Sequence, residues 1–476
     1  MTQSKQNLSL AESLARYPAD RLALVHEAER WSFGDLDERS GLWARWLTDK
    51  GVCTDDLVAF SRGNGPDFIA LVFGIYKAGA TPAPISGKLP DFEREAILDV
   101  MQPRLYVAPA MQPEKSAASS SSSDWPVAAS WKACTSGGST GTPKVIVDRR
   151  PAAFAEGTDF IGIPSDVPIL VPGPLYHNAP FSAAVFALWK GCTVCTMDRF
   201  DEHAVLKTIE REQVEWSIMV PTMLHRIFRL PQEHRVAFDL SSWKMVVHTA
   251  SPMPPWLKEA WIGWLGPDHI WEVYGATEGL VRCWIGGSEW LEHPGSVGRP
   301  IGGARLKILD DCGHEVAHGA NGEVYAMPAG GPQSSYRYIG AERRATADGW
   351  ESVGDIGHVD EEGYLYLADR RTDLIISGGV NIWPAEVEMA ILRHPSVVSC
   401  AVFGQENEDL GQIVRAVIET EDQDLTLKSL CDFLSDYLVR AKHPRSIILQ
   451  KEAVRDDAGK FRKRAATVND LPKEMT

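Results

Sequence analysis

The sequence lacks the features that direct a protein to a membrane, to export or to nucleic acid. No apolar run is long enough to span a bilayer, and residues 1–6 lack the apolar core of a signal peptide. Positive charge is in deficit, because 48 Lys and Arg face 64 Asp and Glu, a formal net charge of −16 at pH 7. This balance argues against nucleic acid or an anionic membrane as a main partner. We therefore expect a cytoplasmic protein without a membrane span.

Cysteine is sparse and scattered. The chain has eight cysteines in 476 residues, and Cys192 and Cys195 have the spacing of a redox or zinc motif. No second pair completes a metal site, and residues 192–197 form an apolar stretch typical of a buried strand. We interpret both cysteines as structural.

The length of the chain predicts more than one domain, and its 44% hydrophobic and 24% charged residues are typical of a globular protein. The first segment is helix-rich and residues 8–17 have an amphipathic pattern; strands then alternate with helices, which favours a layered α/β domain. We expect a short strand before a helix capped by Ser32 or Asp35, a strand at 57–61, a buried helix at 68–77 and a strand at 82–84.

The C-terminal part differs in character. We place a domain boundary near Arg371, which gives domains of residues 1–370 and 371–476. The expected elements are a strand pair at 363–368 and 374–376, a turn at 377–379, a helix opened by Pro384, strands at 397–403 and 413–418, and a helix at 427–438 capped by Thr426.

Three apolar strands of the middle region each run into a loop of small and polar residues. They are expected at residues 216–220, 244–248 and 270–274. Ligands of doubly wound sheets bind just beyond the carboxyl ends of the strands. The three loops therefore predict one shared crevice.

Residues 135–144, TSGGSTGTPK, combine glycines, small hydroxyls and a final lysine. Glycine lets the backbone approach a ligand closely, and backbone N–H groups with hydroxyls can converge on anionic oxygens. No Gly-Lys-Ser/Thr ends the stretch, so it is not a Walker A loop. The alternative is a flexible surface linker, which the serine run at 119–123 upstream favours.

Three further motifs follow this loop in order. They are YGATE at 274–278; Gly354-Asp355 with DRRTD at 369–373 and SGGVNIWP at 377–384; and RDDAGK at 455–460. With these four motifs the chain strongly resembles the adenylate-forming superfamily of acyl-CoA synthetases, luciferases and peptide-synthetase adenylation domains. The match spans nearly the whole chain.

The resemblance implies an α/β fold in two parts. A large N-terminal domain contains layered α/β subdomains plus a β-barrel-like subdomain, and a small α+β C-terminal domain is mobile. It also implies two half-reactions at one site. A carboxylate attacks the α-phosphate of ATP and releases pyrophosphate, and a thiol, usually that of coenzyme A, then displaces AMP.

The resemblance also implies the nucleotide site. Lys144 would clamp the leaving β- and γ-phosphates, Tyr274 would stack on adenine, Asp355 would accept from the ribose hydroxyls and Arg370 would support ribose or phosphate. The complete expected set for ATP and AMP is Ser136, Gly137, Gly138, Ser139, Thr140, Gly141, Lys144, Ser251, Tyr274, Asp355 and Arg370.

Four residues are expected to act in the chemistry. Lys460 resembles the adenylation lysine that bridges the carboxylate and the α-phosphate, a role that suits a compact ammonium. Glu278 resembles the family's Mg²⁺ ligand, since hard oxygen donors suit that ion. Thr277 would touch the α-phosphate, and His177 matches a position beside the acyl carboxylate.

The acyl pocket is expected to be uncharged. Residues 175–184 carry no charged residue apart from His177, which disfavours a substrate with an α-ammonium group. Small and apolar candidates leave room for a bulky hydrophobic acid. Residues 175–178, LYHN, resemble the same stretch in ligases for bile acids, steroids or terpenoid acids, which implies a terpenoid or steroid-like acid; aryl and fatty acids stay open. The candidates are Asn178, Phe181, Ser182, Thr249, Ala250, Ser251, Gly275 and Ala276.

Gly378 and Gly379 are expected to border the tunnel for coenzyme A. The chain departs from the family at Val145, where glycine is usual, and at Thr372, the hinge position that is usually aspartate or lysine. A β-branched residue is stiffer, so we expect Thr372 to make domain rotation less easy than the usual hinge residue does. The chain is also short for the family, which we attribute to trimmed surface loops.

Other functions share parts of this pattern. The acyl acceptor could be a carrier protein acting in trans, because no carrier domain follows Lys460. A luciferase-like oxygenase would share the adenylation step, whereas a non-catalytic nucleotide-binding protein would not need Lys460, Glu278 and Asp355. A monomer and a homodimer are both compatible with the sequence.

Overall fold

The computed structural model describes residues 7–113, 125–136, 143–456, 459 and 461, with Ser136, Arg370 and Thr372 described by their backbone alone. Predictions for Gly137, Gly138, Ser139, Thr140, Gly141 and Lys460 lie outside the described residues, as does the Ser/Ala-rich segment at 114–124. Within the described ranges no helix combines the length and apolar character needed to cross a bilayer.

A central sheet of nine strands runs in the order β16-β15-β14-β13-β12-β10-β11-β2-β3. The strands from β2 across to β14 pair in parallel, whereas β3, β15 and β16 are antiparallel at the two edges. The strands are β2 (Leu22–His26), β3 (Glu29–Ser32), β10 (Pro168–Val171), β11 (Thr193–Thr196), β12 (Trp216–Met219), β13 (Met245–His248), β14 (Ile270–Gly275), β15 (Arg282–Gly286) and β16 (Arg299–Pro300).

Helices connect these strands and pack on the sheet. The α4 helix is apolar all round because it is buried: every residue from Phe181 to Trp189 is inaccessible. Pro221 occupies the first turn of α6, where its missing N–H costs nothing. The helices are α4 (Asn178–Trp189), α5 (Glu202–Glu212), α6 (Pro221–Phe228), α7 (Gln232–Arg235), α8 (Pro255–Leu265), η2 (Pro267–His269) and α9 (Gly287–Glu292).

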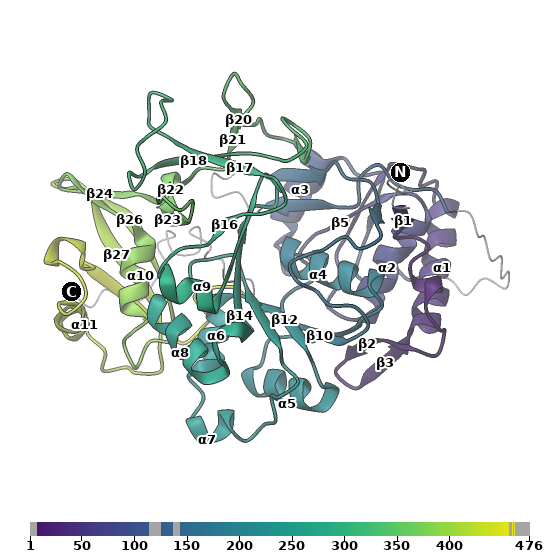
Figure 1. The fold of residues 1–476 in the computed structure, drawn as a ribbon, viewed down its shortest axis with the longest axis horizontal. Helices are drawn as coiled ribbons and strands as arrows, with labels where there is room; N and C mark the ends of the chain where they lie inside the picture. The colour runs from purple at the N-terminus through teal and green to yellow at the C-terminus, as the bar shows by residue number, and fades with distance from the viewer. Residues whose placement is uncertain (1–6, 114–124, 137–142, 457–458, 460, 462–476) are drawn as a thin grey trace.

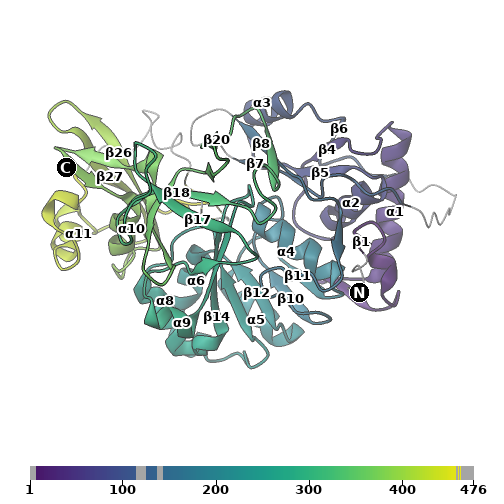
Figure 2. The same cartoon turned by 45° about the horizontal axis from the view of Figure 1, so that its top comes forward.

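A second α/β layer contains the first part of the chain (Figures 1 and 2). Its parallel sheet has the order β5-β4-β6, and a separate antiparallel sheet has the order β19-β8-β7. Ser32 caps α1 in a capping box with Asp35, as predicted. The elements are β1 (Asn7–Ser9), η1 (Leu14–Arg16), α1 (Phe33–Asp49), β4 (Leu57–Phe60), α2 (Pro66–Lys77), β5 (Thr81–Pro84), α3 (Asp91–Met101), β6 (Leu105–Val107), β7 (Ala133–Ser136), β8 (Lys144–Asp148), β9 (Ala153–Ala155) and β19 (Tyr336–Ile339).

A six-stranded antiparallel sheet forms the β-rich subdomain that the resemblance implied. Its strands are β17 (Arg305–Leu309), β18 (Gly322–Met327), β20 (Arg344–Ala345), β21 (Glu351–Ser352), β22 (Asp355–Val359) and β23 (Leu365–Arg370).

The C-terminal elements gather at the opposite end of the molecule from α1 and α2 (Figure 1). They form a five-stranded sheet, with β26 and β27 as its long hairpin, and helices that pack against it. The elements are η3 (Arg371–Asp373), β24 (Ile375–Ser377), β25 (Val380–Ile382), α10 (Pro384–Ile391), β26 (Ser399–Asn407), β27 (Gly411–Glu419), α11 (Leu427–Leu434), η4 (Arg440–Lys442) and β28 (Ser446–Gln450). The predicted fold class, a mixed α/β chain with a large N-terminal and a small C-terminal part, is therefore confirmed.

Two local predictions are wrong. The amphipathic pattern at residues 8–17 is not a helix but the edge strand β1 and the short turn η1, because β1 pairs with β9 and tertiary pairing overrides the local pattern. The strands at 365–370 and 375–377 do not pair with each other: β23 pairs with β22, and β24 with β25 and β27. The six-stranded sheet therefore ends with β23 before η3, and the five-stranded sheet begins with β24 after it.

The hydrophobic cores follow the same division. The core clusters before η3 end at Leu365 or earlier, and the clusters after it begin at Ile375. The two parts touch through α6, where Arg229 donates to the carbonyl oxygens of Val397 (2.6 Å) and Pro395, and His225 bonds the Val398 carbonyl at 3.0 Å.

Candidate active site

The carboxyl ends of β12, β13 and β14 lie side by side, as predicted, because these strands are consecutive parallel neighbours. β10 is the next neighbour of β12, and the loop that follows it leads to His177 at the start of α4. The loops that carry Thr249, Ala250, Thr277 and Glu278 therefore open on one edge of the sheet. A crevice at this edge is the usual ligand position in such folds.

Lys144, Glu278 and Tyr338 form a compact polar cluster at this edge. The Lys144 ammonium lies 3.1 Å from Oε1 of Glu278 and 2.9 Å from the Tyr338 hydroxyl, which in turn donates to the same carboxylate oxygen at 2.6 Å. Lys144 and Ser136 are cross-strand partners in the β7–β8 hairpin, so residues 137–143 connect them. The structure thus brings the predicted phosphate lysine to the predicted Mg²⁺ ligand.

Tyr274 and Asp355 form a second pair. The Tyr274 hydroxyl donates to Oδ2 of Asp355 at 2.6 Å, joining the end of β14 to the start of β22. Asp355 is buried and is the cross-strand partner of Arg370 in the β22–β23 ladder. Three of the residues expected to hold adenosine therefore lie at one place, and the Tyr274 hydroxyl is engaged by the carboxylate.

The predicted acyl residues on α4 face an unpredicted lysine. His177 is the N-cap of α4, and Phe181 lies in the core one turn later. Lys132, just before β7, donates from Nζ to Oδ1 of Asn178 and, at 2.9 Å, to the hydroxyl of Ser182. A buried ammonium group therefore contacts two of the residues that were predicted to line an uncharged acyl pocket.

Ala250 and Gly275 have unusual backbone environments. Ala250 has φ of 80°, a left-handed conformation that costs a non-glycine residue energy, and such strain gathers at functional loops. A Cβ on Gly275 would lie 3.0 Å from the carbonyl oxygen of Val281, so this position tolerates little beyond glycine. Thr249, Ser251, Ala276 and Thr277 are half-buried beside them.

A cluster of three buried ionisable side chains lies beneath these loops, on the strands and the helix that lead to them. Lys258 on α8 lies 2.5 Å from Oε2 of Glu272 on β14, and Nε2 of His248 on β13 lies 3.6 Å from the same oxygen. Burial lowers the pKa of His248 to about 4, so the imidazole is neutral at pH 7. The group connects β13, which ends two residues before Ala250, to β14, which ends at Gly275.

The C-terminal segment reaches the same edge. Gly459 has φ of 75°, and a Cβ there would lie 3.5 Å from Oγ1 of Thr222 at the β12–α6 junction. Arg455 holds this segment, donating to the carbonyls of Cys400 (2.9 Å) and Gly459 (3.0 Å) and pairing with Glu388 at 2.7 Å. Gly459, which precedes Lys460, thus packs against the residues that follow the carboxyl end of β12.

The segment proposed as a hinge is anchored on one side. The Arg371 guanidinium pairs with Asp311 (2.7 Å) and Glu323 (3.3 Å) of the larger part, and η3, which contains Thr372, follows at once. Gly378 and Gly379 make the tight β24–β25 turn with φ of 56° and 82°.

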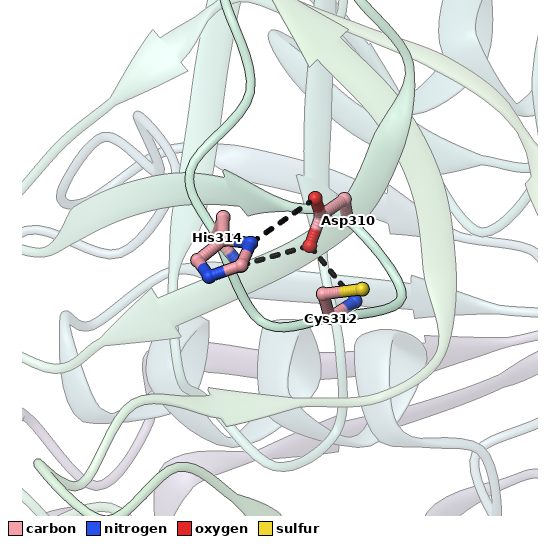
Figure 3. A group of neighbouring side chains, drawn as sticks. All are labelled: Asp310, Cys312 and His314. Carbon is pink, nitrogen blue, oxygen red and sulfur yellow. Dashed lines mark hydrogen bonds and ion pairs between the residues drawn. The ribbon is translucent and has the colours of Figure 1, made fainter.

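Two groups with metal-type side chains have structural explanations. The thiols of Cys192 and Cys195 are buried, and burial raises the pKa of Cys195 to about 12, as expected of the structural strand predicted here. Asp310, Cys312 and His314 meet in an exposed turn (Figure 3), where the Asp310 carboxylate accepts from the backbone N–H groups of Cys312 and His314, both at 2.8 Å. The turn closes on itself, and we assign it no ligand.

Tyr338 and Lys132 are the residues that sequence reasoning missed. Tyr338 lies on β19, paired with β8, and reaches Glu278 through a contact between segments 60 residues apart. Lys132 had a signal, since it interrupts the apolar run from Trp131 to Cys134. A lysine in a buried strand needs a reason.

Comparisons with known proteins place these observations in a family. The family model described as AMP-binding enzyme matches residues 10–136 and 133–338, and the AMP-binding enzyme C-terminal domain matches residues 386–474. The chain is 28% identical to an indoleacetate–CoA ligase of Aromatoleum aromaticum, over 88% of this chain and 89% of that one. It is 27% identical to the long-chain-fatty-acid–CoA ligase FadD13 of Mycobacterium tuberculosis, over 91% and 92%.

The fold is also that of a solved relative. The O-succinylbenzoate coenzyme A synthetase of Bacillus subtilis, solved in complex with AMP, superposes with a TM-score of 0.81 at 24% identity, over 99% of this chain and 100% of that one. Because the two family models together match most of the chain, this protein belongs to the AMP-binding enzyme family.

Proposed function

We propose that this enzyme is an AMP-forming acid–thiol ligase that converts a hydrophobic carboxylic acid to its coenzyme A thioester. It uses ATP, Mg²⁺ and coenzyme A, as acyl-CoA ligases of this family do. The observation that carries the proposal is the convergence at one sheet edge of the Lys144–Glu278–Tyr338 cluster and the Tyr274–Asp355 pair.

In the first half-reaction, a carboxylate oxygen of the acid attacks the α-phosphorus of ATP, and the bond to the bridging oxygen of pyrophosphate breaks. Both reactants are anions, so positioning and cationic groups supply most of the rate. We assign Lys144 to the departing pyrophosphate and Lys460 to the reacting carboxylate and α-phosphate. Asp355 and Arg370 would hold the ribose, and Ser136 to Gly141 would cradle the phosphates.

The donors near Glu278 fit Mg²⁺. Its buried carboxylate and the neighbouring Thr277 hydroxyl are oxygen ligands, which this ion prefers together with phosphate oxygens and water. Bound there, Mg²⁺ would neutralise phosphate charge. The Lys144 ammonium, which now pairs with Glu278, would then be available to the phosphates.

In the second half-reaction, the thiol loses its proton and its sulfur attacks the acyl carbonyl carbon, and the bond to AMP breaks. We propose that Gly378 and Gly379 border the path of the pantetheine arm and that His177 lies beside the acyl carbonyl. We also propose that residues 1–370 and 371–476 are separate domains that rotate about the segment containing Thr372. The Arg371 contacts and the start of the second core at Ile375 support a boundary within this segment.

The acid is proposed to be bulky and hydrophobic. The relatives act on indoleacetate and long-chain fatty acids, which supports an aryl or fatty acid as well as the terpenoid or steroid-like acid suggested by the sequence. A carrier protein in trans is the alternative thiol. We further propose a cytoplasmic location and a monomer or homodimer.

The decisive experiment separates the two half-reactions. A panel of carboxylic acids is assayed for acid-dependent pyrophosphate release, with and without coenzyme A. Lys460→Ala should reduce adenylation by orders of magnitude, whereas Lys451→Ala, an exposed lysine paired with Glu421 at 3.0 Å, should not. Gly379→Leu should block thioester formation and spare adenylation. Unchanged pyrophosphate exchange in Lys460→Ala would refute its role, and equal loss of both half-reactions in Gly379→Leu would refute the tunnel.

A further inference from the structure

Lys132 is a buried cation without a buried anion beside it. Its side chain is 4% exposed, and its ammonium donates to two neutral groups, the Asn178 amide and the Ser182 hydroxyl. It also lies 4.3 Å from the centroid of the Trp131 ring. Among the described residues, no carboxylate lies within ion-pair distance of it. Such an arrangement is costly, since lysines are rarely buried unless paired.

The surroundings increase the positive charge. Asp148 is the nearby buried carboxylate, but Arg150 holds both its oxygens, at 3.0 and 2.6 Å. Arg282 adds another cation, again with no ion-pair partner among the residues that the structure describes. Burial, helped by the charges of Arg150 and Arg282, keeps the pKa of Lys132 below its ordinary value. Lys132, Arg150 and Arg282 thus outnumber the two carboxylates near them, Asp148 and Asp159, and the group has an excess of positive charge.

The hydrogen bond fixes how Asn178 is oriented. A lysine ammonium only donates, so the amide oxygen of Asn178 must face Lys132. The amide NH₂ then points away from the cation. Asn178 is half-buried, whereas Lys132 and Ser182 are buried, so Asn178 is the most accessible member of the cluster. The Asn178 amide therefore presents two N–H donors, and the positive charge of Lys132 lies on the opposite side of the amide.

Arg282, the first residue of β15, lies beside Gly275. Its Cγ lies 3.5 Å from where a Cβ on Gly275 would be, and Gly275 and Arg282 are cross-strand partners. Asn178 and Gly275 were both predicted as acyl residues. Lys132 and Arg282, which are close enough to influence each other's charge, thus each lie beside a residue predicted to line the acyl pocket.

We propose that Lys132, acting through Asn178, recognises a second anionic group on the acid, so that the substrate is a hydrophobic dicarboxylic acid. The reacting carboxylate goes to ATP, and the second carboxylate accepts from the Asn178 amide and neutralises the buried ammonium. This inference rests on the proposed ligase function. It narrows that function from hydrophobic acids in general to those with a second carboxylate.

The test compares matched acids. They are 4-phenylbutanoate, its ortho, meta and para ring-carboxylated forms, and the methyl esters of those ring carboxylates. For wild type, kcat/KM for pyrophosphate release with the best dicarboxylate should exceed that with 4-phenylbutanoate about tenfold or more, the lower range for a hydrogen bond to a charged group. The matching methyl ester should lose most of this preference. A wild-type enzyme that prefers the unsubstituted acid over every isomer would overturn the proposal.

The variants assign the preference to Lys132. Lys132→Met and Asn178→Asp should each bring the ratio close to one, the first by removing the cation and the second by replacing the donors with acceptors. Lys190→Met, at the other end of α4, should keep the wild-type ratio. A preference that survives in Lys132→Met would refute the assignment; should that variant not fold, the half-buried Asn178 variant decides.

A calorimetric titration of the dicarboxylates into wild type and the variants distinguishes a failure of the proposed ligase function from a failure of the proposed carboxylate binding. If no acid supports pyrophosphate release, the ligase function fails, and titration still decides the binding inference. Wild-type binding that is lost in Lys132→Met supports it, and equal binding by both overturns it.

Discussion

Ala250 is strained by its own backbone. It adopts φ of 80°, a region that is unfavourable for any residue with a Cβ. We predict that Ala250→Gly raises the stability by about 1 kcal/mol, because glycine enters this region freely. Thermal unfolding measures the change. Ala187→Gly, in the buried middle of α4, is the control and should lose about 1 kcal/mol or more; a destabilised Ala250→Gly would show that the methyl group makes a contact that outweighs the strain.

Tyr338 links the two charged residues of the phosphate cluster. Its hydroxyl donates to Glu278 at 2.6 Å and lies 2.9 Å from Lys144, so it orients both. We predict that Tyr338→Phe lowers kcat/KM for ATP about tenfold, as expected for a hydrogen bond to a charged group, and leaves the KM for coenzyme A unchanged. Steady-state kinetics with each substrate varied measures this.

Tyr336 is the matched control for Tyr338. It lies on the same strand, and its hydroxyl donates to Glu351 at 2.7 Å. Tyr336→Phe should reduce thermal stability with little effect on ATP kinetics. Similar kinetic losses in both variants would mean that β19 acts through general stability.

At the element scale, α6 carries a contact that depends on pH. His225 bonds the Val398 carbonyl just before β26, and burial, with a contribution from Arg229, lowers its pKa from 6.5 to about 4. Because the folded pKa is lower than the unfolded one, the unfolded chain binds this proton more readily. The contribution of His225 to stability is therefore complete above about pH 6.5 and is lost as the pH falls toward 4.

We predict that His225→Gln flattens the pH dependence of the thermal midpoint between pH 6.5 and 4 relative to wild type. Glutamine can still donate to Val398 but does not titrate. His248 shares this pH window and remains in both proteins, so its contribution cancels in the comparison. Identical slopes for wild type and His225→Gln would exclude a titrating role for the α6 contact.

Over the whole molecule, the cores on the two sides of η3 share no residue. Parts with separate cores can unfold separately. We predict two calorimetric transitions. Leu430→Ala in α11 should lower the midpoint of one transition, and Leu188→Ala in α4 the midpoint of the other. Each should reduce the free energy of unfolding of its own domain by about 2–5 kcal/mol, because both side chains are fully buried. One transition shifted by both variants would show that the domains unfold as a unit.

Local signals predicted many elements well. The capping residues Ser32 and Thr426 and the helix-opening Pro384 have local chemistry that decides where a helix begins, and all three stand where the sequence indicated. The three central strands were also predicted, because buried parallel strands are short apolar runs. Partners were not predictable in this way: β23 and β24 are neighbours in sequence but belong to different sheets.

By itself, the sequence determined the family, the order of its motifs and the identity of the residues that could do the chemistry, because these depend on local composition and spacing. The tertiary structure alone decided which of those side chains meet. Tyr338 reaches Glu278 and Lys132 reaches Asn178 across segments distant in the chain, through strand pairing and helix packing. Asn178 and Ser182, predicted to line an uncharged pocket, are in contact with a buried cation, because side chains distant in the sequence meet in space and charge acts through space.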